Sequence, residues 1–64
     1  MKMSADAVHD LFKEALDKEK FVLDLYLKIL SNTRCEEVKD ELTQISKEER
    51  RHINNIEKIL EEIC

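Results

Sequence analysis

The sequence predicts an all-α fold, in which residues 1–64 form one antiparallel helical hairpin and two copies dimerise into a four-helix bundle. Three features of the chain lead to this prediction. Its 64 residues include no glycine and no proline, so the residue types that commonly break helices are missing. Charged residues make up 41% of the chain while the apolar residues are periodic, which is typical of long amphipathic helices. Residues that favour turns gather at one place, residues 31–34.

The first helix is expected over about residues 5–30. Ser4 is a suitable N-cap, because its side-chain oxygen can accept a hydrogen bond from a free backbone N–H of the first turn. Asp6 then lies where the helix dipole favours a negative charge. Residues that recur at alternating spacings of four and three define a seam along this helix: Val8, Phe12, Ala15, Glu19, Val22, Tyr26 and Ile29.

The turn is expected at residues 31–34 and the second helix over about residues 34–63. Asn32 is predicted to end the first helix in the left-handed conformation, which asparagine adopts when no glycine is available. Thr33 and Glu36 have the spacing of a capping box for the second helix. So short a connection makes the helices antiparallel neighbours. The seam of the second helix is Val38, Leu42, Ile45, Glu49, His52, Ile56, Ile59 and Ile63.

A second apolar stripe runs beside each seam, one position further along the chain. It comprises Leu16, Leu23, Leu27, Leu30, Ile53 and Leu60. Two facing helices bury only a narrow stripe, so the second stripe would stay exposed on a monomer. A chain of this length also buries too little apolar surface to be comfortably stable alone. We therefore expect a homodimer with two-fold symmetry, and a higher oligomer built from it stays open.

The charge pattern and the N-terminus argue against several classes of partner. The net charge is −4 and no basic patch is present, which argues against nucleic acid. No apolar run is long enough to span a bilayer, and the first residues do not resemble a signal peptide. We therefore expect a cytoplasmic protein that binds neither nucleic acid nor membrane.

The two cysteines stand at opposite ends of the second helix. At 1.5 Å per residue Cys35 and Cys64 are roughly 43 Å apart, too far for a disulfide within one chain. They do not form the C-x-x-C pair that is common in metal sites. Cys35 is expected to be a buried cap residue and Cys64 a terminal thiol. A bridge between chains stays open but is unfavourable in a reducing cytosol.

Three polar residues, Glu19, Glu49 and His52, occupy seam positions where apolar side chains are expected. Removing such groups from water is costly unless something compensates them. Glu19 and Glu49 are at nearly the same distance from the turn, and Glu49 and His52 share one helix face. A two-fold dimer would gather four carboxylates and two imidazoles, whose negative charge two divalent cations would balance. This shell of oxygen and nitrogen donors suits iron or manganese, and zinc less specifically.

These residues resemble the ligand pattern of a known family. Glu19 followed by Tyr26 seven residues later, with the Glu-Arg-Arg-His segment Glu49–His52 on the next helix, looks like half of the ferritin-like di-iron carboxylate proteins, rubrerythrin above all. The resemblance implies a terminal ligand (Glu19), a bridging carboxylate (Glu49), a nitrogen ligand (His52) and a tyrosine hydrogen-bonded to a ligand carboxylate across the bundle (Tyr26).

The resemblance also implies an activity. It suggests an oxidoreductase of the ferroxidase or peroxidase type, which oxidises ferrous iron or reduces dioxygen or peroxide with no catalytic residue beyond the metal ligands. The chain lacks the rubredoxin-like C-x-x-C motifs that accompany some members. A peroxidase of this kind would therefore need a separate protein as its electron donor.

The same sequence allows a second function and other roles for single residues. The chain could be a non-catalytic helical adaptor, whose exposed stripe binds the helices of another protein without any metal. Tyr26 could be a core aromatic with its hydroxyl at the rim. Glu48, beside Glu49, is either solvated or an alternative ligand, and His9 is expected at the surface with no role.

Overall fold

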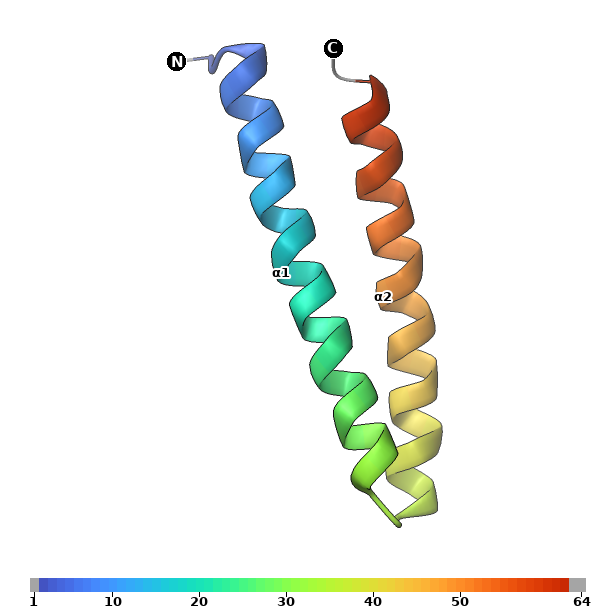
Figure 1. The fold of residues 1–64 in the computed structure, drawn as a ribbon. Helices are drawn as coiled ribbons and strands as arrows, with labels where there is room; N and C mark the ends of the chain where they lie inside the picture. The colour runs from blue at the N-terminus through green and yellow to red at the C-terminus, as the bar shows by residue number, and fades with distance from the viewer. Residues whose placement is uncertain (1, 63–64) are drawn as a thin grey trace.

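The computed structural model of this protein contains two α-helices and describes residues 2–62 (Figure 1). Helix α1 spans Ala5–Asn32 and helix α2 spans Glu36–Glu62, and residues 33–35 join them. The helices run antiparallel and side by side, so α1 begins and α2 ends at the same end of the molecule. The predicted all-α hairpin is therefore confirmed. The expected helix end at Ile63 and the thiol of Cys64 lie outside the described residues.

The start of α1 follows the prediction. Ser4 has an extended backbone, with φ −64° and ψ 160°, and its Oγ accepts a hydrogen bond from the N–H of Ala7 at 3.1 Å. Its carbonyl accepts the first helical hydrogen bond, from the N–H of Val8 at 3.1 Å. Asp6 lies in the first turn, near the positive end of the helix dipole. A serine N-cap therefore fixes where the helix begins.

The end of α1 differs from the prediction. Asn32 stays helical, and its side-chain Nδ2 donates to the carbonyl of Lys28 at 2.7 Å. The helix ends instead at Thr33, whose extended backbone has φ −88° and ψ 146° and whose N–H donates to the carbonyl of Ile29 at 2.9 Å. No residue among 2–62 has a positive φ, so the prediction of a left-handed Asn32 is wrong. An extended β-branched residue ends this helix without that strained conformation.

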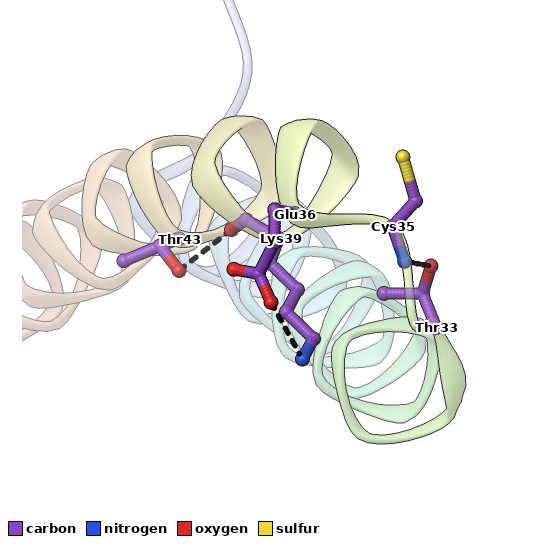
Figure 2. Close-up of polar contacts among 5 residues, drawn as sticks. All are labelled: Thr33, Cys35, Glu36, Lys39 and Thr43. Carbon is purple, nitrogen blue, oxygen red and sulfur yellow. Dashed lines mark hydrogen bonds and ion pairs between the residues drawn. The ribbon is translucent and has the colours of Figure 1, made fainter.

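The start of α2 also lies two residues beyond its expected position (Figure 2). Thr33 Oγ1 accepts a hydrogen bond from the N–H of Cys35 at 3.2 Å, while the carbonyl of Cys35 accepts from the N–H of Lys39 at 3.0 Å. Cys35 is therefore the last residue before α2, and Glu36 pairs with Lys39 at 3.4 Å rather than capping. Cys35 is exposed, so the prediction that it is buried is wrong.

Helix α2 contacts α1 through one narrow stripe of its surface. We call this stripe, whose residues are given at the end of this paragraph, the inner stripe of α2. Only three residues of the described chain are buried, Leu42, Ser46 and Ile53, and all of them belong to α2. Together with three half-buried residues of α2, these buried residues follow one another at intervals of three or four, so all six lie on one face of the helix. The inner stripe therefore consists of Leu42, Ser46, Glu49, Ile53, Ile56 and Leu60.

The seam expected on α2 is only partly correct. Its remaining members in the described chain form an outer stripe with a spacing of seven residues: Val38, Ile45, His52 and Ile59. Ile45 is half-buried, and the other three are exposed. Helix α1 covers less than the full width of the apolar face of α2. The outer stripe, at one edge of that face, therefore stays largely exposed to solvent.

Several large apolar side chains remain exposed on the hairpin. They are Met3, Leu11, Phe21, Leu25, Ile29, Val38 and Ile59. Apolar surface does stay uncovered on one chain, but the prediction that the second stripe would be exposed is wrong. Ile53 is buried and the other five members of that stripe are half-buried, whereas Ile29, Val38 and Ile59 of the expected seam are exposed. Within residues 2–62, no helix carries an apolar stretch of the length that a lipid bilayer requires.

The N-cap gives a first prediction. Ser4→Ala is expected to lower the free energy of unfolding by about 1 kcal/mol, because the N–H of Ala7 loses its acceptor. Denaturant unfolding followed by circular dichroism measures this change. Ser31→Ala is the control, since it removes only a bond to the carbonyl of Leu27, and a change below about 0.5 kcal/mol is expected. Equal effects of the two substitutions would contradict the capping role.

Candidate metal centre

Three side chains of the ligand type meet at the middle of the hairpin. Glu19 and Glu49 each lie within one residue of the midpoint of their helices, and the antiparallel arrangement brings these midpoints together. Glu19, Glu49 and His52 each offer one donor atom, and these three atoms all lie within 4.8 Å of one another. The structure therefore brings together the three residues that the sequence predicted as metal ligands.

The two glutamates and the histidine differ in their exposure. Glu49 belongs to the inner stripe and its side chain is only 15% exposed, with Oε1 3.7 Å from Nδ1 of His52. Glu19 is half-buried on α1. The His52 side chain is 47% exposed, because His52 belongs to the outer stripe. The carboxylates thus lie between the helices, whereas the imidazole lies at the open edge. His52, which was predicted on the seam, therefore lies at the edge of the contact between the helices rather than within it.

The carboxyl pair changes the proton affinity of Glu49. A hydrogen bond with the carboxyl of Glu19 raises the pKa of Glu49 above its ordinary value. Burial and the negative charge of Glu19 raise the pKa further, and they outweigh the opposite influence of His52. In the absence of a cation, Glu49 therefore holds a proton more readily than an isolated glutamate would.

The donor set fits a first-row divalent metal ion. Two carboxylates and one imidazole give a mixture of oxygen and nitrogen donors, as iron, manganese and zinc accept. Metal–ligand bonds of about 2.1 Å place two donors of one ion at most about 4.2 Å apart. A small side-chain adjustment would therefore close the group around an ion. Oε2 of Glu49 is buried and has no hydrogen-bond partner among residues 2–62.

The cluster of ligand-type residues does not include Tyr26, Glu48 or His9. Tyr26 is half-buried two helical turns from Glu19, and its hydroxyl has no hydrogen bond within the described chain. Its expected bond to a carboxylate across the bundle stays a prediction. Glu48 is exposed and is not one of the three clustered residues. His9 is half-buried rather than fully exposed, and it also lies outside the cluster.

One residue of this region, Ser46, was not anticipated from the sequence. It is buried on the inner stripe one turn before Glu49, and its Oγ has no hydrogen-bond partner in the part of the chain that the structure describes. The available signal was its spacing, because Leu42, Ser46, Glu49 and Ile53 follow one another at intervals of four, three and four.

No protein-family model, curated protein or solved structure matches this chain. The resemblance to the ferritin-like di-iron proteins therefore stays a prediction that depends on Glu19, Tyr26, Glu49 and His52. The fold and the clustering of three of these residues are findings that stand independently of it.

The raised pKa of Glu49 predicts how the metal-free protein responds to pH. Because the folded state binds the proton more tightly than the unfolded state, this group stabilises the fold fully below its ordinary pKa. That stability is lost as the pH rises through the raised pKa. Unfolding free energies measured with a chelator, from about pH 4 to about pH 8, should therefore fall with rising pH.

Glu49→Gln should remove most of this pH dependence, because the amide does not titrate. Glu48→Gln is the matched control: it changes an exposed neighbour and should leave the fall intact. A Glu49→Gln protein with the same pH profile as the original chain would show that the glutamate pair does not cause it.

Proposed function

We propose that this chain is a dimeric metalloprotein with a dinuclear iron centre, which oxidises ferrous iron or reduces dioxygen or peroxide. The observation that carries this proposal is the meeting of Glu19, Glu49 and His52 at the midpoint of the hairpin. In a ferritin-like four-helix bundle each copy contributes these three ligands. The proposed roles follow the family resemblance, with Glu49 bridging and Tyr26 supporting a carboxylate.

The distribution of exposed apolar residues supports a second copy as the partner. Viewed along the axis of α2, with 100° of rotation per residue, the outer stripe is displaced from the inner stripe by about a quarter turn, in the direction of lower residue number. On α1, the exposed residues Leu11, Leu25 and Ile29 are displaced about the helix axis from the half-buried residues. The angle is similar to that on α2 and has the same sense of rotation. Because the two helices are antiparallel, equal rotations away from the contact place the outer stripe of α2 and these three residues of α1 on the same side of the hairpin. His52 lies on this apolar face, so a copy packed there would cover it.

The exposed area supports the same conclusion. The chain exposes 5302 Å², whereas a folded monomer of its 7.6 kDa mass is expected to expose about 4,300 Å². The excess of about 1,000 Å² is comparable to the roughly 800 Å² that each partner buries in a standard interface. Because the ligands lie at mid-length, a two-fold axis through them lets the hairpins overlap along their whole length.

The residues provide the conditions that such a centre needs. Four glutamates from two copies offset the charge of two divalent ions and favour their oxidised form. His52 is a neutral donor, and the apolar residues above and below the ligands exclude water. Glu19, Glu49 and His52 of both copies would hold two ferrous ions. These could supply two electrons, enough with two protons to convert dioxygen to hydrogen peroxide or hydrogen peroxide to two waters. Repeated peroxide reduction then requires a separate electron donor.

Anaerobic titration with ferrous iron, followed by absorbance after air is added, tests the metal centre. The original chain should bind two iron ions per dimer and oxidise them. His52→Ala should lower the affinity for ferrous iron by about tenfold or more, since one ligand of each ion is lost. His9→Ala, which removes the other histidine, should leave uptake and oxidation unchanged. Normal uptake and oxidation by His52→Ala would refute the ligand assignment.

The mass in solution tests the dimer. Light scattering should give twice the 7.6 kDa mass of one chain. Ile59→Lys places a charge on the proposed interface and should shift the protein toward monomer at low micromolar concentration. Thr43→Lys is the matched control, because Thr43 is exposed and lies about 100° from the inner stripe in the sense opposite to the outer stripe. Dissociation by both substitutions, or by neither, would contradict this interface.

The exposure of Phe21 favours a second candidate function. Phe21 is 62% exposed and is not one of the α1 residues assigned to the proposed interface, so a non-catalytic helical adaptor could use it to bind another protein. An adaptor predicts no bound metal and no change of melting temperature on chelation. Metal analysis together with the mass in solution separates the two functions.

A further inference from the structure

Two polar atoms in the contact between the helices have no hydrogen-bond partner among residues 2–62. They are Oγ of Ser46 and Oε2 of Glu49. Ser46 is only 5% exposed, which makes it the most buried polar residue of the described chain. The two residues stand three positions apart, so their side chains are neighbours on one face of α2. Buried polar groups nearly always have partners, so this pair needs an explanation.

The hydroxyl of Ser46 behaves differently from two other hydroxyls on these helices. Ser31 and Thr43 each donate to the backbone carbonyl four residues earlier, at 2.9 and 2.8 Å. Ser46 makes no such local bond, although it is far more buried. Its donor is therefore available to a group within the contact between the helices, and Oε2 of Glu49 is the acceptor on the same face that also lacks a partner.

We propose that Ser46 is a positioning residue of the metal centre, whose hydroxyl donates a hydrogen bond to one water molecule that in turn donates to Oε2 of Glu49. This proposal rests on the proposed function and deepens its account of the site. The bond holds the carboxylate in one orientation, with Oε1 near His52 and the metal. A neutral donor does this without adding a charge that would compete with the cation.

A purely structural explanation for Ser46 makes a different prediction. A small side chain at the contact lets two helices approach each other closely, and alanine would serve that purpose equally well. Alanine also favours the helix more than serine does. Ser46→Ala should then leave metal binding unchanged, whereas a positioning residue cannot be replaced by alanine without weakening the site.

The experiment compares the full chain with Ser46→Ala and with Thr43→Ala, which removes an exposed hydroxyl three residues away. Circular dichroism checks that each variant is folded. The affinity for ferrous iron is measured anaerobically by competition with a chelator. We expect Ser46→Ala to lower this affinity by about tenfold or more and Thr43→Ala to change it by less than about twofold. Ser46→Cys, whose thiol is a weak donor, should show the same loss if the alanine variant does not fold.

A double-mutant cycle on the metal-free protein separates this proposal from the proposed function. Ser46→Ala and Glu49→Gln are made singly and together, and their effects on the unfolding equilibrium constant are compared. A positioning bond predicts that the effects differ from additivity by about threefold or more. Additive effects overturn the role of Ser46, and so does unchanged iron affinity in the alanine variant. If the original chain binds no iron, the proposed function fails and the cycle alone decides about Ser46.

Discussion

The two carboxylates held between the helices are the constraint on which the rest of this structure depends. Glu19 and Glu49 lie at the middle of a contact whose buried residues are only Leu42, Ser46 and Ile53. So small a core provides little hydrophobic stabilisation to offset the repulsion of two neighbouring carboxylates. Their proximity therefore requires compensation, by the raised pKa of Glu49 in the free chain and, in our proposal, by cations and a second hairpin.

In the dimer that we propose, metal binding and dimerisation would be coupled. His52 stands on the same open face as the exposed residues Val38 and Ile59, so a copy that covers these residues also removes the imidazole from water. A cation bound by both copies stabilises the dimer, because it binds the assembled site and not the separated hairpins. A dimer in turn supplies the ligands that one chain lacks. Each event therefore makes the other more favourable.

Much of the fold could be predicted because it depends on local rules. Two long helices and one turn were predicted from three local features: the lack of glycine and proline, the N-cap at Ser4, and the one cluster of turn-favouring residues at 31–34. The details of that turn could not be predicted. Either an asparagine in the left-handed conformation or an extended threonine can end a helix, and these differ too little in energy for the sequence to decide. The structure contains the threonine at position 33.

The candidate site was also predicted in part. Spacing alone placed Glu19, Glu49 and His52 near one another, since it depends only on helix geometry and a short connection. The rotation of α2 about its axis could not be obtained in this way, because its apolar face is wide enough for either of two stripes to face α1. The structure places Ser46 and Ile53 in the contact and leaves Ile59 open. The buried serine was missed for this reason.

The central position of the carboxylate pair has a consequence for how the hairpin opens. Residues 33–35 tie the helices together at one end, whereas no covalent link between them is described at the other. Fraying therefore starts at the free end, where the two helices can separate like a zipper. Roughly four turns of α1 must part before the opening reaches Glu19. Local unfolding at the end away from the turn therefore leaves Glu19, Glu49 and His52 close together, and only cooperative unfolding of the hairpin separates them.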